Sequence, residues 1–315
     1  MKNRQRIIFM GTPDFAVPSL KALHNSGHEV ALVVTQPDRP KGRGQKVLFS
    51  PVKEAALELG YDILQPLSVR TPEFYEKAAA LSPDIFVIVA FGHILPKKVL
   101  LIPEKGAINL HASLLPKYRG PAPIQRAIIN MEKETGVTAM LMNEGLDTGD
   151  ILLSAKTEIS SKETSSSLHD RLSLIAGDLL ILTLSGMSTN SVKPVPQNNS
   201  LSTYAPLLKK KDGLIDWSKP AEEIEAFIRG MTPWPGAFTF IGSKRLKIFA
   251  SDVVFIDSKG DPGTVTGETR EKLCIATGKY LLSIKEIQEE SGKRLSIKNY
   301  LHGSNIPPGT ILGRL

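Results

Sequence analysis

Short apolar runs alternate with helix-like patterns through the first half of the 315-residue chain. The runs typical of buried strands span Arg6 to Met10, Glu29 to Thr35, Asp84 to Ala90 and Ala107 to Leu110. Strands that are apolar throughout and alternate with helices are typical of a parallel sheet with both faces covered. The pattern therefore predicts an α/β domain built on a Rossmann-like parallel sheet.

Helix signals occupy the intervals between these strands. Ser50 and Pro51 have the order of an N-cap and a first helical residue, and Gly60 is placed to end the same helix. Two further helices are predicted over residues 120–129 and 165–184, and another, over 221–229, belongs to the C-terminal part of the chain. The helices before residue 189 complete an alternating α/β arrangement with the strands.

The pattern changes after residue 188. Residues 190–206 are rich in Ser, Asn and Pro with little periodicity, which predicts an interdomain linker. Short alternating strands follow, and glycines punctuate them at Gly236, Gly242, Gly260, Gly263 and Gly278. This spacing favours a small β-barrel. We therefore predict a first domain over residues 1–189 and a C-terminal domain over 207–315.

Composition narrows the class of protein. Cys274 is the single cysteine, so no internal disulfide forms, and the polar start of the chain has no secretory pattern. The longest apolar stretch, Leu172 to Met187, is interrupted by Asp178 and is shorter than a bilayer requires. The six histidines are scattered without a carboxylate or thiol at ligand spacing. We expect a cytoplasmic protein with no membrane segment and no metal.

The first strand ends at Gly11-Thr12-Pro13, and no further glycines follow at the spacing of a dinucleotide-binding turn. The chain therefore lacks the usual cradle for a pyrophosphate group. A nicotinamide-dependent enzyme is not favoured.

Positive charge is concentrated in one stretch of a chain whose net charge is +7. Between Gln36 and Lys53, Asp38 opposes five basic residues, Arg39, Lys41, Arg43, Lys46 and Lys53. The stretch has no apolar periodicity and several Gly and Pro, so we expect an exposed, flexible loop. Such a loop suits a phosphate ligand, and a solvated surface loop is the alternative. Arg43, between two glycines, is best placed to contact a phosphate or stack on a base.

Polar residues interrupt the apolar pattern where the strand near residue 110 ends. Asn109 and His111 alternate there, and side chains two apart on a strand point to the same face. In open α/β sheets, ligands bind outside the carboxyl ends of the strands. An amide donor beside an imidazole suits attack by an amine on an activated carbonyl. We predict an acyl-transfer site here, with a structurally satisfied histidine as the alternative.

A glycine-flanked loop, Gly145 to Gly149, separates two strand-like segments, Val137 to Met142 and Ile151 to Ser154. Loops between rigid strands commonly carry catalytic groups, and Asp147 is the candidate. A turn aspartate that satisfies nearby backbone amides is the alternative, and Asp150 can fill that role as well. Spacing alone does not choose between the two readings.

Several segments carry a family resemblance when taken in order along the chain. They are Gly11-Thr12-Pro13-Asp14-Phe15, Gln36 to Gly44, His111 to Pro116, Gly145 to Gly149, Ile215-Asp216-Trp217-Ser218 and Thr232-Pro233-Trp234-Pro235. Together they resemble the methionyl-tRNA formyltransferase family over nearly the whole chain. The resemblance implies a formyltransferase domain followed by an OB-like, tRNA-binding C-terminal domain.

The resemblance also implies roles for individual residues. Asn109, His111 and Asp147 match the formyl-transfer site, in which Asn109 and protonated His111 stabilise an oxyanion and Asp147 orients or charges His111. By resemblance, the expected donor is 10-formyltetrahydrofolate, held by Ser113, Leu114, Leu115 and Pro116 and by the main chain of His93, Ile94 and Leu95. The expected acceptor is initiator methionyl-tRNA, and the expected contacts to its acceptor stem are Arg39, Lys41, Arg43 and Lys46. We expect a monomer acting in translation initiation.

Two rival functions share part of this pattern. A related formyltransferase with a nucleotide-linked sugar amine or glycinamide ribonucleotide as acceptor, or a folate hydrolase, would carry the same Asn109, His111 and Asp147. The arginine-rich insert and the match through the second domain favour tRNA. A noncatalytic tRNA-binding or folate-binding protein is the second rival, and it would bind without forming a formylated product.

Overall fold

The structure is a computed structural model that describes residues 4–41, 46–257, 260–269 and 272–313. For residues 39–41, 46–47 and 267–269 only the backbone is described. The chain forms two compact units. The first consists of Met1–Pro121, Glu134–Thr157 and His169–Ala205, and the second of Ala122–Lys133, Glu158–Leu168 and Pro206–Leu315.

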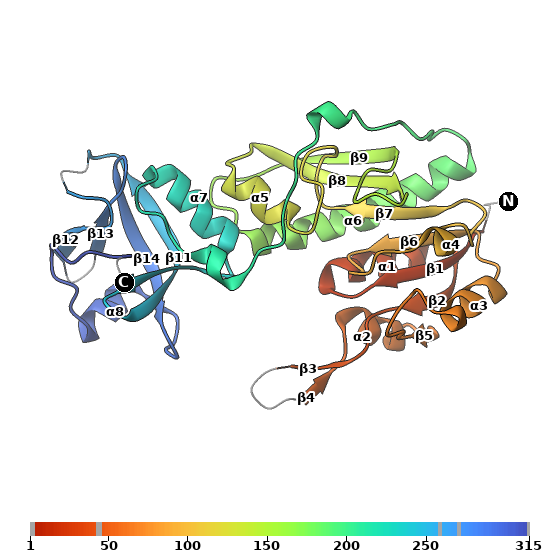
Figure 1. The fold of residues 1–315 in the computed structure, drawn as a ribbon, viewed down its shortest axis with the longest axis horizontal. Helices are drawn as coiled ribbons and strands as arrows, with labels where there is room; N and C mark the ends of the chain where they lie inside the picture. Colours follow the sequence, from red (N-terminus) through yellow and green to blue (C-terminus); the bar gives the residue numbers. More distant parts are fainter. Residues whose placement is uncertain (1–3, 42–45, 258–259, 270–271, 314–315) are drawn as a thin grey trace. The chain divides into compact units, whose positions relative to one another are not determined.

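Within the described residues, the first unit is built on a seven-stranded sheet with the order β5-β2-β1-β6-β7-β8-β9 (Figure 1). The strands are β1 (Arg6–Gly11), β2 (Glu29–Val34), β5 (Ile63–Leu64), β6 (Ile85–Val89), β7 (Ala107–His111), β8 (Glu134–Leu141) and β9 (Ile151–Glu158). From β5 to β7 neighbouring strands are parallel, whereas β8 is antiparallel to β7. The predicted parallel α/β sheet is confirmed.

Helices and 3-10 turns lie between these strands or follow the last of them. They are η1 (Asp14–Ala16), α1 (Val17–Ser26), α2 (Pro51–Glu58), α3 (Pro72–Ala80), α4 (Lys97–Leu100), α6 (Ser165–Ser188) and η2 (Asn199–Leu201). The predicted start of α2 is confirmed, because the Ser50 hydroxyl accepts a hydrogen bond from the Lys53 N–H at 3.1 Å. The prediction missed α1 and α3.

Both faces of the sheet are buried. Residues Ile7 to Met10 of β1 are fully buried although their side chains alternate between the faces. On one face, Ile8 and Phe86 pack in a cluster with Phe74 of α3 and Val99 of α4. Continuous apolar strands therefore reflect two covered faces, as the sequence predicted.

Among the described residues, one helix, α6, has the length and the apolar composition of a membrane-spanning helix. Half of its apolar window is buried inside the protein, and a core helix passes the same test. In the first unit, Gly177 allows α6 to lie close to α1, because a Cβ there would be 3.2 Å from the Pro18 carbonyl oxygen. The packing is typical of a core helix, and the absence of a membrane segment stays a prediction.

The carboxyl ends of three central strands are tied together. The Thr12 hydroxyl, after β1, donates to the Phe91 carbonyl oxygen at 3.3 Å, and the Gln36 amide, after β2, donates to the same oxygen at 3.1 Å. Gly92 has φ +79°, a backbone conformation that favours glycine, and a Cβ there would also lie 2.6 Å from the Gln36 amide nitrogen. These contacts hold the loop after β6 in place beside β7.

The segment predicted as a linker, residues 190–206, is attached to the first unit up to residue 205. Val195 exchanges two backbone hydrogen bonds with Ile151 of β9, and Tyr204 bridges Arg119. Backbone groups of this segment thus form hydrogen bonds to the first unit. Its sequence lacks the periodicity by which strands and helices are recognised. The units and the predicted domains are therefore not divided at the same residues, and the domain bounds stay a prediction.

The second unit contains an antiparallel sheet of six strands in the described part of the chain, with the order β10-β11-β14-β13-β12 and β15 beside β14. The strands are β10 (Ala237–Ile241), β11 (Lys244–Val254), β12 (Val265–Thr269), β13 (Lys272–Ala276), β14 (Leu281–Glu289) and β15 (Leu295–Ser296). The C-terminal segment joins the two edges, since Leu312 bridges Ile241 of β10 and Ile311 bridges Thr264 before β12.

The helices of this unit are α5 (Pro123–Ile129), η3 (Lys210–Gly213), α7 (Ala221–Met231) and α8 (Ile297–Gly303). The prediction began the first of these at Gly120 and was wrong there. Gly120 has φ +111°, which is outside the helical region, and the helix begins only at Pro123. Helices α5 and α7 pack closely, because a Cβ at Gly230 would lie 2.5 Å from Ile129 Cγ1.

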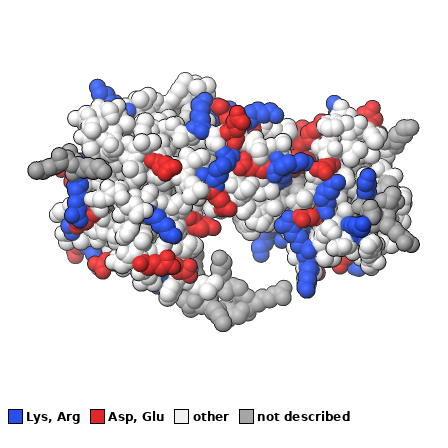
Figure 2. Space-filling model, turned by 180° about the vertical axis from the view of Figure 1, so that it is seen from behind, with Lys and Arg blue, Asp and Glu red and all other residues white. Residues whose placement is uncertain are grey.

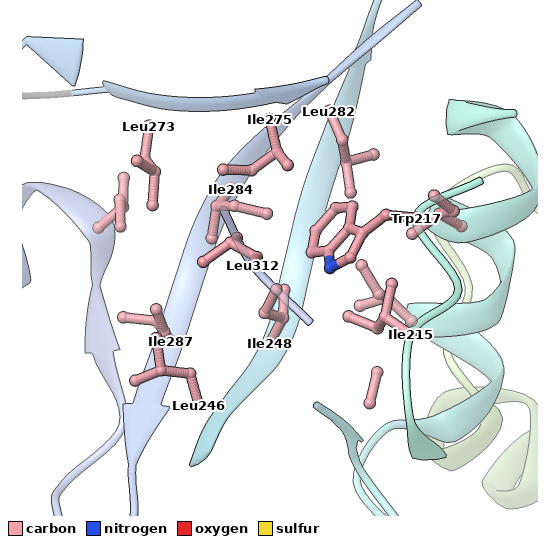
Figure 3. Close-up of a cluster of buried hydrophobic side chains, with 14 of the residues drawn as sticks. Ile215, Trp217, Leu246, Ile248, Leu273, Ile275, Leu282, Ile284, Ile287 and Leu312 are labelled. Carbon is pink, nitrogen blue, oxygen red and sulfur yellow. The ribbon is translucent and has the colours of Figure 1, made fainter. Parts of the chain in front are cut away.

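A second hydrophobic core fills the curled sheet (Figure 3). Trp217 is 5% exposed among Ile248, Ile275 and Leu282, and its indole N–H donates to the Thr239 hydroxyl at 3.0 Å. A buried indole that packs with its ring and hydrogen-bonds with its nitrogen is fully satisfied. This cluster is separate from the one that packs against the first sheet, which agrees with two hydrophobic cores in one chain.

Tyr300 anchors α8 to β14. Its hydroxyl donates to Glu289 Oε1 at 2.7 Å, and burial together with this bond raises the pKa of Tyr300 to about 12. The pKa of an unfolded tyrosine is about 10, so the folded protein will lose stability as the pH rises from about 10 to about 12. The variant Tyr300→Phe lacks the stabilisation that the neutral Tyr300 hydroxyl provides. The difference between the thermal unfolding midpoints of the wild type and this variant will shrink between about pH 10 and about pH 12.

The comparison isolates Tyr300, because lysines titrate equally in both proteins. A constant difference between the two midpoints from pH 8 to pH 12 would show that the pKa of Tyr300 is not raised.

Candidate functional site

Strand β7 places Asn109 and His111 at the carboxyl edge of the sheet. Asn109 pairs with Ile88 of β6 and Met140 of β8, and His111 is the last residue of the strand. The Asn109 side chain is half-buried, and no other described residue forms a hydrogen bond with it. A half-buried carboxamide in this state retains two donors for a ligand.

Both ring nitrogens of His111 face oxygen atoms. The imidazole is 7% exposed, and Nε2 lies 2.8 Å from the Tyr118 carbonyl oxygen. A carbonyl can only accept, so Nε2 carries a proton and donates it. On the other side, Nδ1 lies 3.6 Å from Asp147 Oδ2. A proton on Nδ1 would thus face a carboxylate.

The loop between β8 and β9 holds Asp147 at this position. Its Oδ2 accepts a hydrogen bond from the Gly120 N–H at 2.8 Å, whereas no described residue bonds to Oδ1. The geometry separates the two aspartates that spacing left open, because Asp147 and not Asp150 lies beside His111. The three predicted residues are brought to one edge of the sheet.

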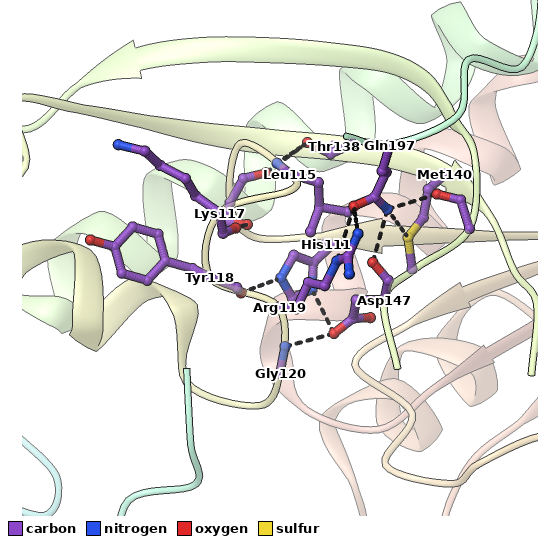
Figure 4. A network of polar contacts seen from close by, with 12 residues as sticks. His111, Leu115, Lys117, Tyr118, Arg119, Gly120, Thr138, Met140, Asp147 and Gln197 are labelled. Atoms are coloured by element: carbon purple, nitrogen blue, oxygen red, sulfur yellow. Dashed lines mark hydrogen bonds and ion pairs between the residues drawn. The ribbon is translucent and has the colours of Figure 1, made fainter. Parts of the chain in front are cut away.

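Two residues that the sequence did not single out complete the network (Figure 4). The Gln197 amide donates to the carbonyl oxygens of Asp147 at 2.8 Å and Gly149 at 2.7 Å. Arg119 donates to Gln197 Oε1 from Nε at 3.0 Å and from Nη2 at 2.7 Å. Gln197 belongs to the predicted linker, where composition masked it. The other residues around Gln197 are also mostly polar, so no local sequence signal distinguished it.

The residues predicted to hold the folate form an ordered turn after β7. Ser113 is fully buried, and its hydroxyl donates to the Lys117 carbonyl oxygen at 2.7 Å. Thr138 of β8 donates to the Ser113 carbonyl oxygen and accepts from the Leu115 N–H. Leu115 is buried and Pro116 follows through a cis peptide bond, while Leu114 is half-buried. The Ser113 side chain is thus occupied within the protein.

The second predicted folate segment follows β6. Ile94 is 68% exposed, whereas Leu95 is buried among the apolar residues of the first core. The His93 ring packs against Phe91 with ring centroids 5.0 Å apart. Ile94 therefore presents an exposed apolar side chain on the loop after β6, and the contacts of this segment with a folate stay a prediction.

The basic stretch is an antiparallel hairpin of β3 (Arg39–Lys41) and β4 (Lys46–Leu48). The sequence predicted an exposed, flexible loop, and the loop is wrong for residues 39–41 and 46–48, because the pairing of two short strands needs no apolar periodicity. The predicted exposure and flexibility stay predictions. Arg43 lies outside the described residues, and the side chains of Arg39, Lys41 and Lys46 are not described. Their contacts with tRNA stay predictions.

The base of the hairpin carries less free positive charge than its sequence suggests. Lys53 forms an ion pair with Asp38, and both side chains are mostly buried. Hydrogen bonds from Lys53 and Gln65 hold the pKa of Asp38 below its usual value. Lys53 is therefore paired at the base of the hairpin.

Metal ligation has no support in the part of the chain that the structure describes, where no group of three or more His, Cys, Asp or Glu side chains could hold an ion.

Two family models match the chain. The model described as "Formyl transferase" matches residues 5–184, and the model described as "Formyl transferase, C-terminal domain" matches residues 207–305. The first match covers more than half of the chain and contains Asn109, His111 and Asp147. With the parallel sheet and these three groups at its edge, the matches define the class. The chain belongs to the formyl transferase family.

Curated relatives indicate one branch of this family. The chain is 49% identical over 308 residues to the methionyl-tRNA formyltransferase of Caldanaerobacter subterraneus subsp. tengcongensis, covering 98% of this chain and 99% of the relative. It is 50% identical over 309 residues to that of Citrifermentans bemidjiense, covering 98% and 96%. The resemblance to the methionyl-tRNA formyltransferases is confirmed over 98% of the chain.

Solved structures share the fold at lower identity. An N-formyltransferase from Helicobacter canadensis, in complex with folinic acid and dTDP-3-aminofucose, is 23% identical with a TM-score of 0.68 and covers 91% of this chain and 100% of its own. HypX from Aquifex aeolicus, in complex with tetrahydrofolic acid, is 19% identical with a TM-score of 0.62. The match covers 95% of this chain and 47% of HypX, so this chain spans about half the length of HypX. These two similarities concern the fold alone.

Proposed function

We propose that the protein transfers the formyl group of 10-formyltetrahydrofolate to the free α-amino group of initiator methionyl-tRNA. The single observation that carries the chemistry is His111, held between the Tyr118 carbonyl and the Asp147 carboxylate, with the unoccupied Asn109 amide on the same strand. The relatives that carry this name at about half identity over 98% of the chain support the choice of acceptor.

Asn109 and His111 stabilise the charge that develops on the formyl oxygen. The amine attacks the formyl carbon, a C–N bond forms, and the carbonyl electron pair moves to oxygen. The Asn109 amide donates to that oxygen, and protonated His111 places its positive charge beside it, with Nε2–H donating to the Tyr118 carbonyl and Nδ1–H facing Asp147. Donors fixed before the reaction stabilise such an oxyanion without reorganising in the transition state.

The Asp147 carboxylate accepts the proton that the attacking amine loses. Its Oδ2 faces His111 and the Gly120 N–H, which fixes the carboxylate, and its Oδ1 is the oxygen without a bond to a described residue. Oδ1 accepts the proton that leaves the attacking amine. When the intermediate collapses, the bond from the formyl carbon to the folate nitrogen breaks and that nitrogen takes up a proton. One proton thus moves from the amine to the folate.

The predicted folate segments flank this edge of the sheet. Residues 113–116 follow β7 and residues 93–95 follow β6, the neighbouring parallel strand. Ile94 and Leu146 are exposed apolar side chains on the loops after β6 and β8. Apolar walls with accessible backbone groups suit a flat heterocycle. We propose that the pterin lies between these loops.

Basic residues in both units would contact the tRNA backbone. Figure 2 shows Lys and Arg side chains on both units, interspersed with Asp and Glu on that face. In the second unit, exposed lysines occur at Lys209, Lys210, Lys211 and Lys244. We propose that this unit is an OB-like barrel, since the C-terminal segment bridges both edges of its sheet. A monomer in the cytoplasm would meet charged tRNA directly.

One assay tests the function. The protein is incubated with 10-formyltetrahydrofolate and methionyl-tRNA, and the methionine is examined for a formyl group, with uncharged tRNA and nucleotide-linked sugar amines as controls. Formylation of methionyl-tRNA alone is expected. Formylation of a sugar amine instead would show that methionyl-tRNA is not the acceptor. Binding of tRNA without a formylated product would refute the proposed enzymatic activity.

The variant Arg43→Ala should weaken the use of tRNA without affecting folate. We expect a higher KM for methionyl-tRNA and a salt dependence of log kcat/KM that is shallower by about one, because one phosphate contact is lost. Initial rates at several salt concentrations measure both quantities. Arg70→Ala, which removes an exposed arginine of the same unit, is the matched control.

The folate KM decides how the Arg43 result is read. An equal loss of affinity for folate would mean that residues 42–45 support the fold of the site rather than bind tRNA.

A further inference from the structure

Three consecutive residues contact the candidate site from one side. The Tyr118 carbonyl accepts from His111, the Gly120 N–H donates to Asp147, and the Arg119 guanidinium donates to Gln197. Tyr118 and Gly120 both have positive φ, at +60° and +111°, so successive backbone groups can face different partners. This short turn therefore joins the imidazole, the carboxylate and a glutamine from a distant part of the chain.

The Gln197 carboxamide is fully used. Its nitrogen donates to the carbonyl oxygens of Asp147 and Gly149, and its oxygen accepts twice from Arg119. A guanidinium can only donate, so the Gln197 oxygen must face Arg119 and the nitrogen must face the loop. Arg119 thereby fixes the orientation of the amide, and it is held in turn by a bond to Asn199 Oδ1 at 2.8 Å.

The loop that receives these bonds adopts a restricted conformation. Asp147 has φ +52°, a left-handed value that residues other than glycine seldom adopt. A Cβ at Gly149 would lie 1.6 Å from the Leu141 carbonyl oxygen, so this position requires glycine. Such a conformation persists only where surrounding contacts hold it. The two donors of Gln197 bond to the loop on either side of Thr148.

We propose that Gln197 is a positioning residue for formyl transfer, whose carboxamide, oriented by Arg119, holds the loop so that the Asp147 carboxylate faces His111. The proposal rests on the function proposed above. Gln197 acts through Asp147 and touches neither substrate. A displacement of a catalytic group by about 1 Å can lower a rate by about 100-fold, so a small movement of this loop matters.

Two substitutions of Gln197 separate this role from simple structural support. Gln197→Met has a similar length and removes every hydrogen bond of the carboxamide. Gln197→Glu keeps an acceptor for Arg119 but replaces the donating nitrogen by an oxygen, which would face the carbonyl oxygens of Asp147 and Gly149. We expect both variants to lower the single-turnover rate about 10-fold to 100-fold, with an unchanged KM for folate. If Gln197 served only to hold Arg119, Gln197→Glu would be close to the wild type.

A double variant tests whether the effect passes through Asp147. In an Asp147→Asn background, Gln197→Met should lower the residual rate by less than about twofold, because residues that act as a unit are not additive. Gln288→Met is the control, since Gln288 also donates to a backbone carbonyl, that of Gly292, but lies in the second unit. It should leave the rate unchanged.

The outcomes are distinct. Full activity of Gln197→Met, wild-type activity of Gln197→Glu, or an equal loss in the Asp147→Asn background would each overturn the proposal. If Gln197→Met does not fold, Arg119→Met leaves Gln197 free to turn over and should show the same rate loss at unchanged folate KM. If the wild type formylates another amine, the function fails while the same rate comparison, made with that amine, still tests Gln197.

Discussion

Replacing Asn109 with alanine will lower the rate of formyl transfer by about 100-fold to 1000-fold, the usual effect of removing one oxyanion donor. The Asn109 side chain has no hydrogen bond to any other described residue, so the substitution leaves no protein partner unsatisfied. The loss should therefore appear in the rate and not in the thermal stability. Single-turnover measurements at saturating folate and methionyl-tRNA give the rate directly.

The KM for folate should stay unchanged, because the predicted amide contact strengthens only in the transition state. Asn299→Ala serves as the control, since Asn299 is exposed on α8 of the second unit. An Asn109→Ala enzyme that retains near full activity would remove Asn109 from the mechanism.

Replacing Asp147 with asparagine will lower the rate by about 100-fold to 10,000-fold, the range of general acid–base contributions. Asparagine keeps the size of the side chain and an oxygen that can accept from the Gly120 N–H, so the loop should hold its position. It removes the negative charge 3.6 Å from His111 Nδ1 and the acceptor for the amine proton. The change therefore tests the chemistry separately from the fold.

Asp150→Asn is the matched control, because Asp150 lies three residues further along the same loop and away from His111. We expect its rate and thermal midpoint to match those of the wild type. The roles would be reversed if Asp150→Asn lost activity while Asp147→Asn kept it, and a turn function for Asp147 would follow.

The two predictions differ in how well the sequence supported them. Asn109 and His111 could be paired from sequence because the two-residue period of a strand is local. For Asp147 the sequence provided only a candidate, since its distance from His111 depends on how β8 pairs with β7 and on the path of the loop after β8. The choice between Asp147 and Asp150 needed the antiparallel pairing of β7 with β8 and the contact with Gly120.

Gln197 shows why a residue of the network escaped prediction. It lies 50 residues from Asp147 in the sequence, within a segment whose Ser, Asn and Pro content predicted a linker. A segment without regular secondary structure has no periodic signal, even where its polar groups are fully bonded. The hairpin β3–β4 was missed for the same reason, because short strands of polar residues lack an apolar pattern.

The sequence by itself determined the central strands, the burial of both faces of the sheet, the division into two cores and the kind of chemistry that Asn109 and His111 can perform. These properties depend on side-chain type and on short periodicities. The tertiary structure decided which aspartate faces the imidazole, which backbone carbonyl fixes its tautomer, and that Gln197 and Arg119 support the loop. Such relations arise from long-range chain crossings, and no local pattern of residues encodes a distance between groups on separate elements.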